Sequence, residues 1–291
     1  MRWIGALVVL AACSSDGSTT IDGSTGDGAG GDGAPIDGPP SAACGAPNGP
    51  TGAMAETITV GGTARTYVRF VPAGYDSARA YPLIFAWHGR GGNGSNARQY
   101  FGIETASAGE AIIVYPDGLP VSGDPADTGW ELEATGRDVA LFDALQVKLS
   151  SAYCIGRTYS IGHSFGGYMS NAIGCHRGGT GPTAVRAIAP FAGGGPFGTC
   201  AGGPISAVVM HGIEDMVVLF EQGEGSRDAW LAKAGCEATS QPIDPSPCVV
   251  YDGCDDGLTV RFCAHTDTTN SGHGWQTFAS PAAWALFQAS P

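Results

Sequence analysis

The segment that most constrains the fold is residues 159–167, of sequence YSIGHSFGG, in which an apolar strand, a sharp turn and a helix follow one another. Ser164 stands at the apex of the turn. Gly162 and Gly166 remove the side chains that would collide with the crossing strand or helix. In a strained turn of this kind the serine Oγ projects, and the next backbone N–H is free to face an anion. We therefore interpret Ser164 as a candidate nucleophile.

Hydrophobic patterning predicts that strands and helices alternate along the chain. Residues 81–87 (YPLIFAW) form a continuous apolar run, which is typical of a parallel strand buried on both faces. We expect a hairpin over 56–71, strands at 81–87, 111–115, 154–161, 185–191, 205–210 and 258–263, and helices at 138–149, 165–175 and 281–289. The fold class is therefore α/β: a mostly parallel, doubly wound sheet with an antiparallel start and helices on both faces.

Ligands of such sheets bind at the carboxyl ends of the strands, and polar loops follow several of the predicted strands there. The strand at 81–87 ends in a glycine-rich loop that begins at His88. In this position we expect the backbone N–H of Arg90 to be one donor to an oxyanion. The N–H of Phe165, which follows the serine, is the other expected donor.

A serine hydroxyl becomes nucleophilic when a histidine takes its proton and a carboxylate orients that histidine. Around a turn of this kind, the acid and then the histidine follow the serine in the chain. Asp215 lies just past the strand at 205–210, and we favour it over the adjacent Glu214. Among the later histidines we favour His273, which lies between two glycines, and interpret His265 as a solvent-exposed loop residue.

The N-terminus has the features of an export signal. A charged start and a short apolar run are followed by the sequence LAAC, which resembles a bacterial lipoprotein signal with Cys13 as the lipidated residue; a plain secretory signal is the alternative. Residues 14–43 contain five Asp-Gly pairs, no aromatic residue and no basic residue. We expect them to form a disordered linker between the signal peptide (1–13) and a catalytic domain (44–291).

Cysteine content agrees with export. Eight cysteines follow Cys13, and an even number in an exported chain indicates disulfides. Their spacing lacks a Cys-x-x-Cys pattern, which argues against the alternative of a zinc site. We expect neither a metal nor a cofactor.

The net charge of −13 repels nucleic acid, so we expect no nucleic-acid partner. The lipid on Cys13 is the expected contact with a membrane. We predict a monomer that is either a membrane-anchored bacterial lipoprotein or an extracellular protein.

From residue 44 onward the chain resembles the secreted esterase family of feruloyl esterases, acetyl xylan esterases and polyhydroxybutyrate depolymerase-like proteins, within the α/β-hydrolase superfamily. The matching motifs stand in order along the sequence: Gly61-Gly62, His88-Gly89, Tyr115-Pro116-Asp117-Gly118, Trp130, Gly162-His163-Ser164-Phe165-Gly166-Gly167, His211-Gly212 with Asp215, and Gly272-His273-Gly274-Trp275. The resemblance implies a triad of Ser164, Asp215 and His273. Members of the family often have a small residue or cysteine where Arg90 stands, so this position departs from the pattern.

The resulting hypothesis is a serine carboxylic-ester hydrolase that forms a covalent acyl-enzyme and acts on feruloyl or acetyl esters of plant polysaccharide. Trp130 and Trp275 are candidate residues for stacking on the substrate. A polyhydroxybutyrate depolymerase is the alternative within the same class. From another class, the alternative is a catalytically inactive lipoprotein that binds carbohydrate at the cell surface.

Overall fold

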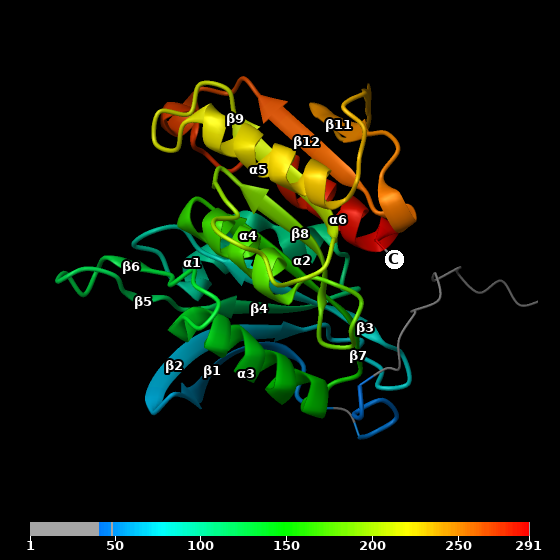
Figure 1. The fold of residues 1–291 in the computed structure, drawn as a ribbon. Helices are drawn as coiled ribbons and strands as arrows, with labels where there is room; N and C mark the ends of the chain where they lie inside the picture. Colours follow the sequence, from blue (N-terminus) through cyan, green and yellow to red (C-terminus); the bar gives the residue numbers. More distant parts are fainter. Residues whose placement is uncertain (1–40, 48, 291) are drawn as a thin grey trace, which may run out of the picture. The chain divides into compact units, whose positions relative to one another are not determined.

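A single large sheet organises the fold of residues 41–47 and 49–290, which are the residues that the computed structural model describes (Figure 1). Within them the sheet has ten strands in the order β1-β2-β4-β3-β7-β8-β9-β12-β11-β10. Pairing is parallel from β4 through β12 and antiparallel at both edges. The strands are β1 (Gly52–Val60), β2 (Thr63–Val71), β3 (Tyr81–Trp87), β4 (Ile112–Pro116), β7 (Ile155–His163), β8 (Val185–Phe191), β9 (Ser206–Gly212), β10 (Ser240–Pro242), β11 (Cys248–Tyr251) and β12 (Val260–His265).

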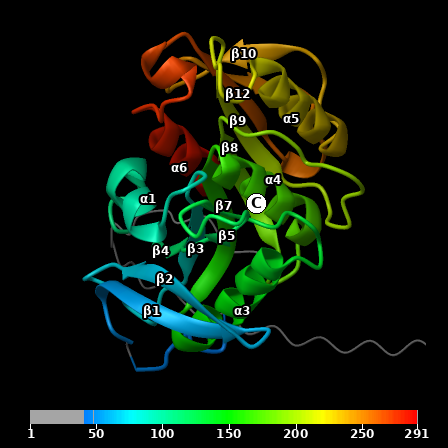
Figure 2. The ribbon, with the colours of Figure 1, turned by 90° about the vertical axis from the view of Figure 1, so that its left-hand side faces the viewer.

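Helices cover both faces of the sheet, as predicted (Figure 2). On one face lie α3 (Arg137–Ala152), α4 (Phe165–Arg177) and α5 (Phe220–Lys233). On the other face lie α1 (Gly94–Phe101), α2 (Ile103–Ala106) and α6 (Ala279–Ala289). Two short 3₁₀ helices, η1 (Asp255–Gly257) and η2 (Thr269–Gly272), and a small separate hairpin of β5 (Leu119–Pro120) and β6 (Thr128–Gly129) complete the structure.

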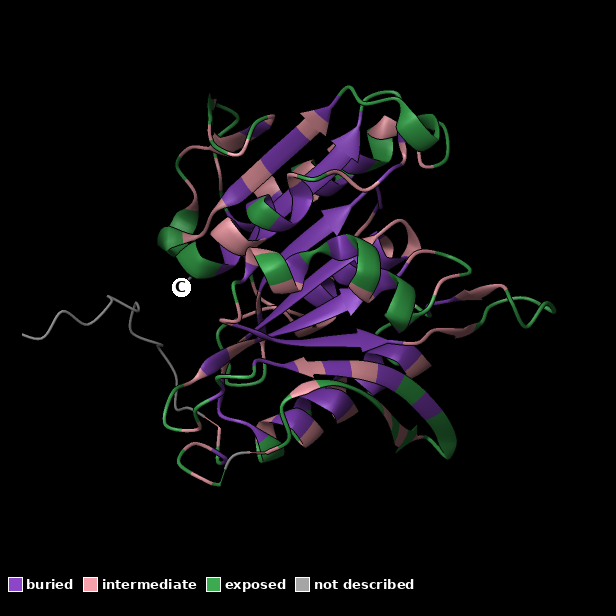
Figure 3. Ribbon diagram, turned by 180° about the vertical axis from the view of Figure 1, so that it is seen from behind, coloured by how far each residue is buried: buried purple, intermediate pink, exposed green. Residues whose placement is uncertain are grey.

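Burial follows this layering. The central strands are buried along almost their whole length, whereas β1 at the edge has only intermediate and exposed residues (Figure 3). The continuous apolar run of β3 therefore packs into a hydrophobic core on each face: Leu83 and Phe85 contribute to one core and Ile84 to the other. Both faces of the parallel strands are thus covered. A binding site is therefore expected in the loops at the strand ends.

The sequence analysis located the main strands and the helices α3, α4 and α6, and it missed β10, β11, α1 and α5 together with the short elements α2, β5, β6, η1 and η2. The expected hairpin and the predicted strands correspond to β1 to β4, β7 to β9 and β12. The antiparallel pair β10–β11 was not predicted, because its short strands lie in the cysteine- and proline-rich segment that was interpreted as a loop. Helices α1 and α5 were missed because each contains glycine and many polar residues, which hides the helical periodicity.

Eight cysteines form four disulfides within the described residues: Cys44–Cys154, Cys175–Cys200, Cys236–Cys254 and Cys248–Cys263. The zinc alternative is therefore wrong. Cys44–Cys154 closes a sequence separation of 110 residues, and the loss of chain entropy in the unfolded state contributes about 5 kcal/mol for a loop of that length. Disulfides of this number indicate an oxidising, extracytoplasmic environment.

The predicted signal peptide, its Cys13 and most of the predicted linker lie outside the described residues. The linker was expected to extend to residue 43, but Ser41 already contacts the sheet: its hydroxyl donates to the Tyr153 carbonyl at 2.7 Å and accepts from the Ile155 N–H at 2.9 Å. Among the described residues, Ser41 is thus already attached to the domain. No helix among residues 41–47 and 49–290 has both the length and the apolarity needed to cross a bilayer.

Candidate functional site

The turn between β7 and α4 holds Ser164 in a strained backbone conformation. Its φ of 56° and ψ of −120° lie outside the regions that residues other than glycine usually adopt. The Ser164 N–H donates to the carbonyl of Phe191 at the end of β8, at 2.9 Å. The neighbouring strand thus fixes the turn, and the Ser164 side chain lies at the carboxyl edge of the sheet.

Two glycines make this turn possible. A Cβ on Gly162 would collide with the backbone carbonyl of Gly166, and a Cβ on Gly166 would collide with the carbonyl of Trp87 on β3. The reason inferred from the sequence for this spacing is therefore confirmed, and the structure identifies the colliding atoms. The turn brings β3, β7 and α4 into direct backbone contact.

Asp215 and His273 meet although 58 residues separate them in the sequence. The His273 Nδ1–H donates to Asp215 Oδ2 at 2.7 Å. The other carboxylate oxygen, Oδ1, accepts from the N–H groups of Val217 and Val218 at 2.8 and 2.9 Å. Asp215 is buried, whereas Glu214 is exposed. The carboxylate therefore fixes the tautomer of His273 and leaves its Nε2 free of a proton.

A second histidine supports the backbone of His273. The Nε2–H of His163 donates to the His273 carbonyl at 2.8 Å, and the Tyr100 hydroxyl is 3.3 Å from His163 Nδ1. Burial lowers the pKa of His163 to about 4, so its ring is neutral near neutral pH. Tyr100 lies on α1, an element that the sequence analysis missed, so the contact was not anticipated.

The loop after β3 carries the expected oxyanion donor at Arg90. His88 fixes the start of the loop: its Nδ1–H donates to the Gly89 carbonyl at 2.7 Å, and its Nε2 accepts from the Gly118 N–H at 2.9 Å. Among the described residues, neither the Arg90 N–H nor the Phe165 N–H donates a hydrogen bond, whereas the N–H of Gly91 does. Both expected donors are therefore available to a ligand.

Two cavities meet at Ser164. The His273 cavity, of about 700 Å³, is lined by His88, Gly89, Arg90, Gly91, Gly92, Asn96, Tyr100, His163, Ser164, Val217, Asn270, His273, Gly274 and Trp275. The Phe197 cavity, of about 410 Å³, is lined by Arg90, Leu132, Ser164, Phe165, Tyr168, Phe197, Val217 and Val218. Only the first contains a histidine, and the second is mostly aromatic and aliphatic. The structure thus places Ser164, His273 and both expected donors at one site.

Two expectations about this region are wrong. Trp130 is only 2% exposed and lines neither cavity, so it cannot stack on a substrate. Its indole N–H donates instead to the His88 carbonyl at 2.9 Å, which supports the loop from below. His265 is also buried, at 5% exposure, against the ring of Phe191, and is not a solvent-exposed loop residue. Trp275, in contrast, lines the His273 cavity as expected.

Several residues that line the site gave no signal in the sequence. Phe197 belongs to the segment after β8, and its ring lies parallel to that of Tyr168 at 5.8 Å between centroids. Val217 follows the acid and is 63% exposed. An aromatic residue in a loop or an aliphatic residue after a strand is common in any sequence, so only the three-dimensional arrangement identifies them.

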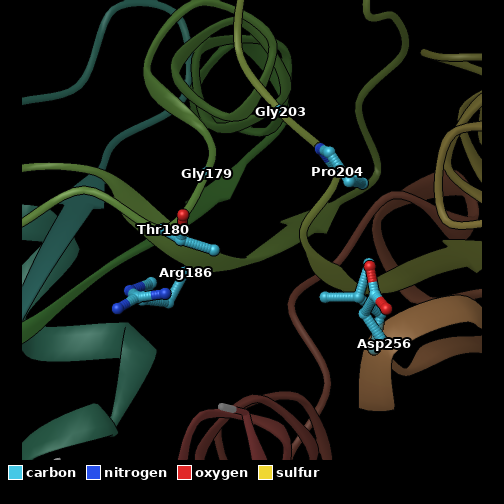
Figure 4. A pocket seen from close by; sticks show the side chains of 7 residues that line it. Gly179, Thr180, Arg186, Gly203, Pro204 and Asp256 are labelled. Carbon is cyan, nitrogen blue, oxygen red and sulfur yellow. The ribbon is translucent and has the colours of Figure 1, made fainter. Parts of the chain in front are cut away.

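A further cavity, of about 500 Å³, lies at the opposite end of the strands (Figure 4). Arg186 near the start of β8, Pro204 before β9 and Leu258 before β12 are among the residues that line it. Because these strands are parallel, their starts lie at the edge of the sheet away from Ser164. This cavity is therefore separate from the candidate site.

We expect acid to destabilise the fold partly through His163. Its pKa is about 4 in the folded protein and about 6.5 in an unfolded chain. Between these values the unfolded state binds the proton and the folded state does not, so the free energy of unfolding falls as the pH falls from about 6.5 to about 4. In His163→Gln, which keeps a side-chain N–H donor, urea unfolding between pH 4 and 7 should show a shallower decline. His88, His211 and His265 contribute to the pH dependence of unfolding in both the parent protein and the variant. Only the part due to His163 should disappear, so equal slopes in the two proteins would contradict this assignment.

Comparisons with known proteins agree with this arrangement. No protein-family model matches the chain. Among solved structures, an acetyl xylan esterase from Aspergillus awamori has a TM-score of 0.55 at 16% identity, over 73% of this chain and 93% of that one. A ferulic acid esterase from Anaeromyces mucronatus has a TM-score of 0.52 at 19% identity, over 82% of this chain and 90% of that one. These likenesses show that the fold is that of the α/β-hydrolases.

The relatives found by sequence identify the family of the chain more closely than the solved structures do. Feruloyl esterase D of Neurospora crassa is 32% identical over 249 residues, which cover 78% of this chain and 81% of the relative. Feruloyl esterase C of Emericella nidulans is 31% identical over 242 residues, covering 78% and 84%. At this identity and coverage, and with a serine at a strained strand–helix turn beside an oriented histidine, the chain belongs to the feruloyl esterase family and is a carboxylic ester hydrolase.

Proposed function

We propose that Ser164, His273 and Asp215 are the catalytic triad of a feruloyl esterase that acts on plant polysaccharide. The observation that carries the proposal is that Ser164 borders an aromatic cavity on one side and a cavity containing His273 on the other. Feruloyl esterases are also the relatives that the chain matches.

In the proposed reaction, His273 Nε2 takes the proton of the Ser164 hydroxyl as Oγ attacks the ester carbonyl. Asp215 stabilises the imidazolium through its hydrogen bond to Nδ1. The negative charge on the carbonyl oxygen is stabilised by the N–H groups of Arg90 and Phe165. Phe165 is the first residue of α4, so the helix dipole adds to this stabilisation.

The collapse of this intermediate releases the alcohol and leaves an ester between the acid and Ser164. His273 gives its proton to the leaving alkoxide, which must therefore lie on the histidine side of the serine. Water then enters at the same side and loses a proton to His273, which passes a proton to Ser164 Oγ as the bond to the acyl group breaks and the free acid is released. These steps need no cofactor.

The position of the histidine assigns the two cavities. The departing sugar occupies the His273 cavity, whose lining includes the polar side chains of Asn96, Tyr100 and Asn270. The acyl group occupies the Phe197 cavity, where Tyr168 and Phe197 provide aromatic surface for a phenolic ring. Aromatic pairs contribute about 0.5–1.5 kcal/mol beyond area burial, which favours feruloyl over acetyl.

Phe197→Ala should lower kcat/KM for methyl ferulate about ten-fold, since a stacking contact of about 1.4 kcal/mol is lost. The same variant should leave kcat/KM for 4-nitrophenyl acetate unchanged, because acetate is too small to reach the ring. Phe197 is 58% exposed, so its replacement should not disturb folding. Val147→Ala, which changes an exposed residue of α3, is the control. Equal losses for both substrates, or none for methyl ferulate, would contradict the assignment.

The substrate class is tested directly on four substrates: methyl ferulate, acetylated xylan, 4-nitrophenyl acetate and a polyhydroxybutyrate film. We expect release of ferulic acid at the highest kcat/KM. Degradation of the film alone would show that the alternative, a polyester depolymerase, is correct. Preference for acetylated xylan would place the chain with the acetyl esterases.

We further propose that the protein is exported and held at a membrane by lipid on Cys13. Support comes from the LAAC sequence and from the four disulfides, which fit an oxidising compartment. When the chain is expressed in a bacterium with its own leader, Cys13→Ser should move esterase activity from the membrane fraction to the soluble fraction. Activity that stays soluble in both proteins would contradict the anchor. The soluble variant should elute as a monomer in size-exclusion chromatography.

A further inference from the structure

The Arg90 side chain points away from its own loop and pairs with the β5–β6 hairpin. Its Nε and Nη2 donate to the two carboxylate oxygens of Asp127 at 2.5 and 2.7 Å. This two-bond geometry, in which the planar guanidinium matches the carboxylate, is the strongest arrangement of such a pair. The Asp127 side chain is 19% exposed and that of Arg90 is 64% exposed, so the pair lies at the mouth of the site.

Thr128, which follows Asp127, forms hydrogen bonds with the two residues that come after Arg90 in the loop that follows β3. The Gly91 N–H donates to the Thr128 carbonyl at 2.8 Å, and the Thr128 hydroxyl donates to the Gly92 carbonyl at 2.7 Å. Four hydrogen bonds thus connect residues 90–92 with the dipeptide 127–128. The Arg90 N–H, which would face the oxyanion, is left without an acceptor in the described part of the chain.

The same hairpin also reaches the second expected donor. Gly129 at the end of β6 packs against the ring of Phe165, where a Cβ would collide with the ring. The hairpin is held from its other side, since the Arg137 guanidinium donates to the Pro120 carbonyl at 2.9 Å. A two-stranded hairpin of this size has little stability of its own, so these contacts define its position.

We propose that Asp127 is a positioning residue: through its paired contact with Arg90 it holds the backbone N–H of Arg90 in line with the oxyanion that forms at Ser164. The inference rests on the proposed function. A donor acts on the oxyanion only within about 2.7–3.1 Å, and a misplacement of about 1 Å can cost two orders of magnitude in rate. A residue that touches no substrate can therefore control kcat.

The ionisation of the pair agrees with such a role. Hydrogen bonding to Arg90 lowers the pKa of Asp127 to about 2. Asp127 is therefore ionised near neutral pH, and the charged contact with Arg90 persists there.

The test compares Asp127→Asn, Arg90→Ala and the double variant with Asp143→Asn in the full-length enzyme. Asp143 forms the same two-bond pair with Arg177, at 2.7 Å for each bond, between α3 and α4 away from the site. It is therefore a matched control for the loss of an exposed ion pair. Methyl ferulate and 4-nitrophenyl acetate are the substrates, and thermal unfolding checks that all variants fold.

We expect Asp127→Asn to lower kcat about ten-fold for both substrates, with KM within about two-fold of the parent value and no greater loss of Tm than in Asp143→Asn. Because both residues act through one contact, the double variant should be no slower than Arg90→Ala alone. Two results would overturn the inference: kcat equal to that of Asp143→Asn, or a raised KM at unchanged kcat, which would indicate a substrate contact.

These outcomes are separable from a failure of the proposed function. If Ser164→Ala keeps the parent activity, the proposed triad is wrong whatever Asp127 does. If activity requires Ser164 and Asp127→Asn behaves as the control does, only the positioning role is lost.

Discussion

The site depends on the close backbone contact at the turn between β7 and α4. Gly166 lies directly against the Trp87 carbonyl of β3, and the Ser164 N–H is bonded to the Phe191 carbonyl of β8. Three central strands and one helix therefore meet at this turn, where the backbone of Ser164 is strained. Strain of this kind costs on the order of 1–3 kcal/mol, and it persists because the buried strands around it leave no room to relax. The same contact leaves the Phe165 N–H without an acceptor among the described residues, where it can serve as a donor.

The loops around this turn are fixed in pairs. The acid loop is bonded to the histidine loop through the Met216 N–H and the Ser271 carbonyl at 2.9 Å. The oxyanion loop is bonded to the β5–β6 hairpin, and His163, one residue before the nucleophile, supports the His273 carbonyl. Each group that the proposed chemistry requires is thus held by a neighbouring loop, although all of these loops lie on the surface.

Buried strands and the order of the polar residues that follow them could be predicted from the sequence. The run 81–87 is typical of a strand buried on both faces, and the glycines around Ser164 favour the sharp turn. Asp215 follows β9 and His273 lies in the segment after β12, and these two strands are neighbours in the sheet. The positions of individual side chains could not be predicted. Trp130 is a large apolar residue in a loop, and only the packing of that loop decides that it lies under His88 and not in the cavity. Likewise, Tyr100 and Phe197 become part of the site through α1 and the segment after β8, whose patterns carry no functional signal.

Covalent labelling of the serine tests the central claim most directly. The folded protein is treated with an alkyl phosphonate that carries a nitrophenyl leaving group, and the modified residue is located by peptide mass spectrometry. The account predicts one phosphonate per chain, attached to Ser164, with complete loss of esterase activity and no labelling of Ser164→Ala. Folded, active protein that stays unlabelled, or that is labelled at another residue, would contradict it.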